Sequence, residues 1–219
     1  MKNKILVIAV HPDDETLGCG GTLLKHKASD DKIHWLICTN LNKDHHYYLD
    51  RQKEIKKVSK LFNFDSVHNL RFETTKMDQY NMIEIIEKIS KVINKIKPNI
   101  IYLPFKEDVH TDHKKIFEAS YSCTKSFRYP FIKKIYMMET LSETEFAPST
   151  KKDSFIPNTF VDINKHMKKK IQITKIYKSE IGNHPFPRSV RSIKALASFR
   201  GSTSGCKFAE SFMLLKEIL

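Results

Sequence analysis

Short apolar segments alternate with amphipathic segments along the first 140 residues, and this alternation constrains the fold more than any other feature. Apolar runs predict buried strands at residues 4–10, 32–39, 66–72, 99–105 and 132–139. Apolar residues at helical spacing predict helices at residues 21–29, 50–62, 80–97 and 112–126. Because strands that alternate with helices form βαβ units around a mostly parallel sheet, the sequence predicts an α/β fold.

The chain becomes less regular after the fifth predicted strand. Residues 142–157 are typical of a surface loop, further helices are expected at 165–179 and 188–197, and a short apolar tail follows. No repeat or linker interrupts the sequence, and 219 residues suit one hydrophobic core. We therefore expect residues 1–219 to form a single domain with a Rossmann-like three-layer fold, a sheet of order 3-2-1-4-5 and C-terminal additions.

The composition and the cysteines favour a soluble, cytoplasmic protein. No window reaches the ~18 consecutive apolar residues of a membrane span, which excludes a membrane-spanning protein. The apolar start leads into "HPDDE" without a signal-peptide cleavage site, so a buried first strand explains it better. The four cysteines are scattered and form no CxxC pair, which favours free thiols and argues against a thiolate zinc site.

The net charge of +13 comes mainly from lysine and has two interpretations. The positive field would attract an anionic substrate, such as a nucleotide sugar or a phospholipid-linked sugar, but a lysine-rich genome would give the same charge. The lysines are spread over predicted helix surfaces and form no single basic block. Because no basic stripe with interleaved aromatic residues occurs, we expect no nucleic-acid partner.

Two clusters of ionisable residues follow two of the predicted strands. "HPDDE" at residues 11–15 comes after the first strand, and "EDVHTDH" at residues 107–113 comes after the fourth. In a 3-2-1-4-5 order these strands flank the switch point, where ligands of open α/β sheets bind at the carboxyl ends of the strands. We therefore expect the two clusters to meet in one crevice, although they lie about a hundred residues apart in the sequence.

The residues of the two clusters suit a catalytic metal site. His11, Asp14 and His113 supply two imidazoles and a carboxylate, a ligand set for zinc that leaves a position open for water or substrate. A divalent cation lowers the pKa of its water and polarises a carbonyl, which are the requirements for hydrolysing an amide. Taken singly, each aspartate of the first cluster is most simply a helix cap, so the prediction depends on the two clusters together.

The remaining residues of the clusters have separate predicted roles. Asp13 is placed to act as general base toward the water. His110 is expected to donate to the oxygen of the tetrahedral intermediate or to protonate the leaving amine, with Asp112 fixing its orientation and charge. Glu15 either holds the turn or reaches toward the metal site, and the sequence leaves both roles open.

"HPDDETLGCGGT", together with "HTDH" downstream, resembles the PIG-L/LmbE-like family of zinc-dependent N-acetylglucosaminyl deacetylases. The resemblance implies the same roles at the same positions: metal ligands His11, Asp14 and His113, base Asp13, and oxyanion stabiliser His110 with Asp112 behind it. "RQKEIKKVSKLF" is similar to the family's Arg-x-x-Glu helix, which implies that Arg51 lies near the sugar or its phosphate. Residues 195–212 resemble the family's C-terminal segment.

Several segments depart from the family pattern or lack an assigned role. His45, His46, Tyr47 and Tyr48 replace smaller residues after the second strand, and they either line a sugar site or lie on the surface. His184 and Arg188 in "NHPFPRS" have no fixed place in the pattern. Three glycines, Gly18, Gly20 and Gly21, are expected in the first turn, where either the backbone approaches a ligand or the helix packs closely on the sheet. A structural role is favoured, since "GCGG" lacks the GxGxxG spacing of a dinucleotide site.

The leading hypothesis is a metal-dependent hydrolase that removes the N-acetyl group from an N-acetylated amino sugar and releases acetate and a free amine. The sugar is of the N-acetylglucosamine type, either free or part of a glycoconjugate or nucleotide sugar, and the expected cofactor is Zn²⁺, with Fe²⁺ as the alternative in the cell. The alternative hypothesis is a non-catalytic nucleotide or sugar-phosphate binding module. The sequence does not indicate an oligomeric state.

Overall fold

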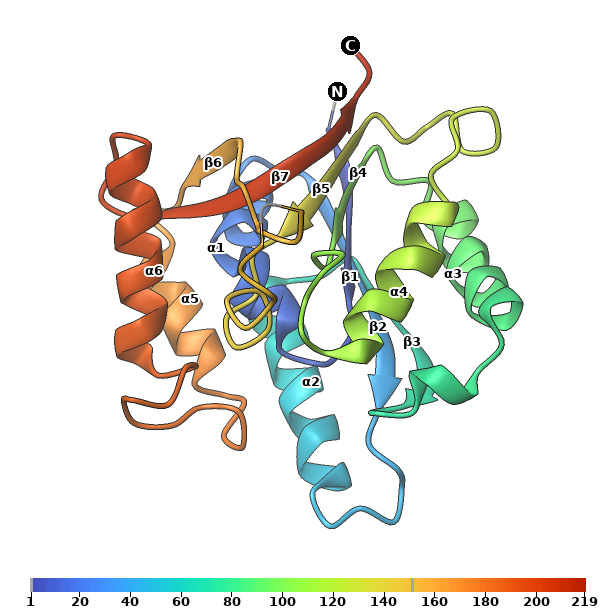
Figure 1. The fold of residues 1–219 in the computed structure, drawn as a ribbon, viewed down its shortest axis with the longest axis horizontal. Helices are drawn as coiled ribbons and strands as arrows, with labels where there is room; N and C mark the ends of the chain where they lie inside the picture. The colour runs from blue at the N-terminus through green and yellow to red at the C-terminus, as the bar shows by residue number, and fades with distance from the viewer. Residues whose placement is uncertain (1, 151) are drawn as a thin grey trace.

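A computed structural model describes residues 2–150 and 152–219, and a seven-stranded sheet of order β3-β2-β1-β4-β5-β7-β6 forms its centre (Figure 1). Five strands are parallel: β1 (Lys4–Ala9), β2 (Lys32–Asn40), β3 (Ser66–Glu73), β4 (Ile100–Leu103) and β5 (Lys134–Met138). Two more, β6 (Thr159–Asp162) and β7 (Ala209–Glu217), are antiparallel to their neighbours. The predicted α/β class, the order 3-2-1-4-5 and the C-terminal additions are confirmed.

Helices cover both faces of the sheet and give three layers (Figure 1). The helices are α1 (Asp14–Ala28), α2 (Tyr48–Phe62), η1 (Met77–Gln79), α3 (Met82–Ile96), α4 (Thr111–Ser122), α5 (Met167–Thr174) and α6 (Val190–Thr203). Alternate residues of β1 point to opposite faces: Leu6 and Ile8 pack with α3 and α4, whereas Ile5 and Val7 pack with α1, α2 and α5. Both faces of β1 are therefore buried, as the continuous apolar run predicts.

The glycines expected in a turn lie inside α1 instead, and that prediction is wrong. Helix α1 begins at Asp14 and includes Gly18, Gly20 and Gly21, with a kink where Cys19 has φ −145°. A Cβ at Gly18 would lie 2.9 Å from the Met138 Cβ, and a Cβ at Gly21 would lie 2.7 Å from the Ile163 Cγ2. Close packing of the helix on β5 and on the segment after β6 thus explains Gly18 and Gly21.

Two buried side chains from the C-terminal third complete the backbone hydrogen bonds at this kink. The Glu210 carboxylate accepts from the Gly21 and Thr22 amides at 2.8 and 2.7 Å. Lys170 donates to the Leu17 carbonyl at 2.8 Å and pairs with Glu210 at 2.7 Å. Since a buried backbone group without a partner is costly, these two residues stabilise the kinked helix.

The C-terminal third contains more regular structure than expected. The apolar tail is part of β7, a nine-residue strand between β5 and β6, and the helix expected at 165–179 is limited to Met167–Thr174. Helix α6 packs against β7, and its buried Ile193 and Ala197 join a small cluster with Met167. None of the described helices is long and apolar enough to cross a membrane.

Candidate metal-dependent active site

The turn after β1 and the loop between β4 and α4 meet at the carboxyl edge of the sheet, where strand order reverses. They line a pocket of about 190 Å³. Predicted site residues in its wall are His11, Asp13, Asp14, Arg51 and His110, and the others are Pro12, Leu41, Thr74, Glu143, Glu180 and Arg188. The expected meeting of the two clusters is thus present at the switch point.

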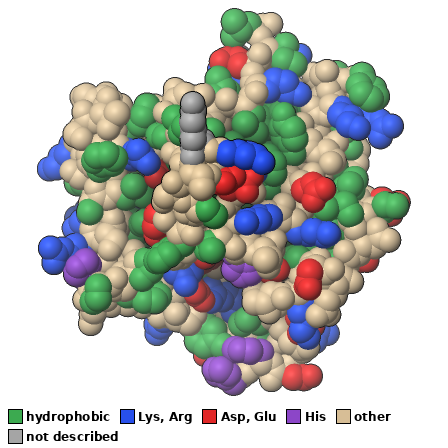
Figure 2. Space-filling view, in the orientation of Figure 1, with side chains coloured by type: hydrophobic (Ala, Val, Ile, Leu, Met, Phe, Trp, Pro, Cys, Tyr) green, Lys and Arg blue, Asp and Glu red, His purple; other side chains and the backbone are tan. Residues whose placement is uncertain are grey.

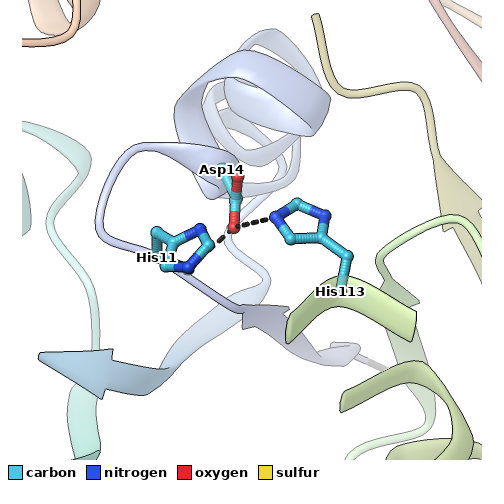
Figure 3. A group of neighbouring side chains, drawn as sticks. All are labelled: His11, Asp14 and His113. Atoms are coloured by element: carbon cyan, nitrogen blue, oxygen red, sulfur yellow. Dashed lines mark hydrogen bonds and ion pairs between the residues drawn. The ribbon is translucent and has the colours of Figure 1, made fainter. Parts of the chain in front are cut away.

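His11, Asp14 and His113 point toward one another from the turn, the start of α1 and the start of α4 (Figure 3). One nitrogen or oxygen atom from each residue lies within 4.8 Å of the other two. The Asp14 Oδ2 accepts from the His11 amide at 2.8 Å and lies 3.4 Å from the His113 Nε2. His113 is fully buried and Asp14 is 3% exposed, so the groups are shielded from bulk water.

His113 is oriented as metal-binding histidines are. Its Nδ1 is 2.8 Å from the Asp108 Oδ2, and the Thr144 hydroxyl donates to the other Asp108 oxygen at 2.6 Å. Its Nε2 is buried and has no hydrogen-bond partner among the described residues. Burial lowers the pKa of His113, but the Asp14 and Asp108 carboxylates outweigh burial and raise it to about 9. The His113 Nε2 has no hydrogen-bond partner among the described residues, and the Asp108 carboxylate fixes its ring, so this nitrogen is suited to bind a cation.

Asp112 is placed differently from the expectation that its carboxylate fixes His110. The Asp112 Oδ2 contacts the His11 Nε2 at 3.2 Å and accepts from the Thr75 amide at 2.7 Å. Its contact with His110 is through the backbone, because the Asp112 amide donates to the His110 Nδ1 at 3.1 Å. The carboxylate therefore orients the His11 ring, and the amide orients the His110 ring.

His110 is a neutral donor in this geometry. Burial, followed by the neighbouring His11 and His113, lowers its pKa to about 4. Since the Nδ1 accepts a hydrogen bond, the neutral ring carries its proton on Nε2. His110 also lines the pocket, so it can donate to a bound oxygen there.

Asp13 has a strained backbone that neighbouring side chains hold in place. Its φ of 146° and ψ of −27° are unusual for a residue with a side chain, a strain of roughly 1–3 kcal/mol. The buried Glu15 carboxylate accepts from the Asp13 amide at 3.1 Å and from the Tyr177 hydroxyl at 2.8 Å. Glu15 thus holds the turn, and burial raises its pKa to about 7.

Asp13 is 3% exposed, and its carboxylate pairs with Arg188, whose Nη1 lies 3.1 Å from the Asp13 Oδ2. Burial and then the neighbouring Asp14 raise the pKa of Asp13, whereas Arg188 lowers it. Sequence reasoning singled out Arg188 but gave it no role. Only the tertiary structure brings residue 188 beside residue 13.

Arg51 lines the pocket but its donors are used within the protein. It is 5% exposed, donates to the Pro12 carbonyl at 3.0 Å and to the Ser179 hydroxyl at 2.9 Å, and pairs with Glu180. Arg51 therefore braces the turn from α2. Its predicted contact with substrate stays a prediction.

Other residues singled out in the sequence lie outside the pocket wall. The rings of His45 and His46 stack 4.5 Å apart on an exposed loop, and His184 is exposed as well. Tyr47 donates to Glu54 at 2.7 Å. Sequence reasoning missed Glu143, a pocket residue whose pKa burial raises to about 7.

An open α/β sheet with a histidine–aspartate cluster at its switch point is the arrangement of a metal-dependent enzyme. The family model described as GlcNAc-PI de-N-acetylase (PIG-L) matches residues 6–124, more than half of the chain. The chain therefore belongs to this family. It is also 24% identical to the diacetylchitobiose deacetylase of Thermococcus kodakarensis, in an alignment that covers 98% of this chain and 84% of that protein.

Two solved structures share the fold. The N,N'-diacetylchitobiose deacetylase of Pyrococcus horikoshii has a TM-score of 0.79 and 19% identity, over 98% of this chain and 84% of that one. GalB, the 4-carboxy-2-hydroxymuconate hydratase of Pseudomonas putida, also has a TM-score of 0.79, with 13% identity over 100% and 98% of the two chains. Because a deacetylase and a hydratase share this fold, the fold alone does not indicate the reaction, which has to be inferred from the residues of the site.

Proposed function

We propose that the protein is a metal-dependent hydrolase that removes the acetyl group from an N-acetylated amino sugar. The observation that carries the proposal is the buried, orphaned His113 Nε2, which faces the Asp14 carboxylate and shares a cluster with His11. Membership of a de-N-acetylase family supports the reaction class, and the relatives named as deacetylases support an N-acetyl substrate.

We propose that His11, Asp14 and His113 hold the cation and that the cation is zinc. Two imidazoles and one carboxylate form a three-ligand set typical of catalytic zinc, and iron(II) is the alternative for the same donors. When bound, such a cation polarises the amide carbonyl and makes water more acidic. The Asp108 contact to the His113 Nδ1 supports the proposal, because metal-binding histidines commonly donate their second N–H to a carboxylate.

The chain's own residues then move the protons. Asp13 accepts a proton from water as the water oxygen adds to the acetyl carbonyl carbon. The His110 Nε2–H donates to the carbonyl oxygen as negative charge develops on it. When the carbon–nitrogen bond breaks, Asp13 returns its proton to the leaving nitrogen, and the products are acetate and a free amine.

A lysine-lined groove supports an anionic substituent on the substrate. The groove has a volume of about 670 Å³ and lies between α2 and the segment 172–179 at the end of α5, with Lys57, Lys175 and Lys178 in its wall. Lys53 and Asp50 also line it and pair with each other at 2.9 Å. Glu54 and Ser179 also line it, and both contact Arg51 in the pocket wall, so the groove adjoins the pocket. Lysine and arginine side chains are scattered over the face shown in Figure 2. A phosphate or carboxylate attached to the sugar would fit beside these ammonium groups.

Release of acetate tests the proposal. The metal-loaded protein is incubated with free N-acetylglucosamine, diacetylchitobiose and N-acetylglucosamine 1-phosphate, and acetate and free amine are measured. We expect equal amounts of the two products from at least one sugar, and no product after chelation. A protein that binds these sugars without releasing acetate, with its metal present, supports the alternative binding module instead.

Two wider expectations remain part of the proposal. We propose that residues 1–219 form one domain, which the single sheet supports because it includes strands from both ends of the chain. We also propose a cytoplasmic location, on the cysteine pattern of the sequence.

A further inference from the structure

We propose that Arg188 is a positioning residue that fixes the carboxylate of Asp13 for its role as base. The inference rests on the proposed function and adds a residue from the C-terminal third to the machinery of the site. Glu180 and Arg188 lie far from Asp13 in the sequence, but all three residues line the same pocket.

The Arg188 guanidinium bridges two carboxylates. Its Nη1 lies 3.1 Å from the Asp13 Oδ2, and its Nη2 lies 3.2 Å from the Glu180 Oε2. No hydrogen bond within the described residues engages the Asp13 Oδ1, and Asp13 lines the pocket. Arg188 therefore holds one oxygen of the carboxylate and leaves the other to meet a water molecule.

Glu180 fixes the position of the guanidinium. Its Oε1 accepts from the Ser179 hydroxyl at 2.8 Å and from Arg51, which in turn donates to the Pro12 carbonyl at 3.0 Å. The chain of contacts thus starts at residue 12, passes through both arginines and returns to residue 13. A closed set of contacts of this kind restricts the carboxylate more than one ion pair would.

An arginine is required for this bridge. The planar guanidinium presents two Nη donors at a fixed angle, whereas a lysine ammonium is a point charge on a flexible stem. The Arg188 Nε is buried without a hydrogen-bond partner among the described residues, so the two Nη atoms make the contacts with carboxylates. The guanidinium carbon also lies 5.7 Å from the centre of the Phe186 ring. Ser189 follows directly as the N-cap of α6 and accepts from the Ser192 amide at 3.1 Å, which fixes the backbone beside Arg188.

The test compares Arg188→Ala with Arg188→Lys and with Arg191→Ala, a matched control at an exposed arginine of the same segment. With a sugar that the wild type deacetylates, we expect kcat of Arg188→Ala to fall about 10- to 100-fold with little change in KM and in bound metal. Added guanidinium, at concentrations that leave the wild type folded, should restore part of the lost kcat. The kcat of Arg188→Lys should lie below that of the wild type, and the kcat of Arg191→Ala should equal it.

Three results would overturn the inference: an unchanged kcat in Arg188→Ala, a rise in KM alone, or a loss of kcat that guanidinium does not relieve in a folded, metal-loaded variant. Failure of the wild type on every sugar counts against the proposed function. A crystal structure of Arg188→Ala then decides the inference without activity. A displaced Asp13 carboxylate supports it, and an unmoved one contradicts it.

Discussion

The segment from β1 to α4 and the segment from β5 to β7 contribute differently to the pocket. The first segment supplies the candidate metal ligands, the candidate base and His110, all at the carboxyl ends of β1 and β4. The second supplies side chains that hold them: Tyr177 behind Glu15, Arg188 beside Asp13, and Lys170 and Glu210 at the kink of α1. The candidate chemical groups thus all come from the first segment. The second segment adds to the support that Asp108, Asp112 and Arg51 give within the first, and the predictions below test this division.

The largest effect is expected at His113, in the first segment. His113→Ala removes the orphaned Nε2, so the variant should lose most of its bound metal and its deacetylase activity. The loss should exceed the roughly 10- to 100-fold that removal of an outer partner of a metal site causes. Elemental analysis and acetate release measure both quantities. His46→Ala, at an exposed histidine, is the matched control, and equal metal content in the two variants would refute the assignment.

Asp13→Asn tests the separation of base from ligand within the same turn. The amide keeps the size of the side chain and can still accept from Arg188, but it cannot accept a proton from water. We expect metal content to stay at the wild-type level while kcat falls about 10²- to 10⁴-fold. Turnover at the wild-type rate would show that another group is the base, and Glu143, which also lines the pocket, would be the next candidate.

Lys170→Met tests the supporting role of the second segment. The substitution breaks a pair in which Lys170 and Glu210 are only 4% and 5% exposed, and it leaves the Leu17 carbonyl without its donor. We expect the free energy of unfolding in urea to fall by about 3–5 kcal/mol. Lys168→Met, at an exposed lysine of the same helix, should change it by less than about 0.5 kcal/mol. Similar values for the two variants would contradict the role given to Lys170.

Gly21→Ala tests the close packing of α1 on the segment after β6. The added Cβ would lie 2.7 Å from the Ile163 Cγ2, so overpacking should destabilise the fold by about 1–3 kcal/mol. Gly20→Ala is the control, since its Cβ would have no neighbour nearer than 3.4 Å, and alanine favours a helix over glycine by about 1 kcal/mol. If thermal unfolding shows Gly21→Ala to be as stable as Gly20→Ala, close packing does not explain Gly21.

The first segment was predictable because its signals are local. Apolar runs and helical spacing correctly predict the strands and α-helices from β1 to α4. The start of α1 differs, because the helix begins at Asp14 and includes the three glycines. The meeting of "HPDDE" and "HTDH" also follows from sequence, because parallel strands place their carboxyl ends at one edge. The resemblance to a deacetylase family rests on these same motifs and agrees with the match over residues 6–124.

The second segment was less predictable because its roles depend on tertiary contacts. The residues of β7 show no strict alternation, since the strand is buried at its start and partly exposed toward its end. Arg188 follows "NHPFP", and no local pattern indicates that it reaches Asp13, 175 positions away. The Asp112 carboxylate contacts His11 rather than His110, which is two positions away, and only the folded loops determine this.

Anomalous diffraction from crystals grown with zinc tests the central claim most directly. Among residues 2–150 and 152–219, two groups of side chains could hold a cation, and both include His11: one with Asp14 and His113, the other with His110 and Asp112. We predict one strong zinc peak within bonding distance of the His113 Nε2, the Asp14 carboxylate and His11. A peak between His110 and Asp112, or no peak in the pocket, would contradict the account.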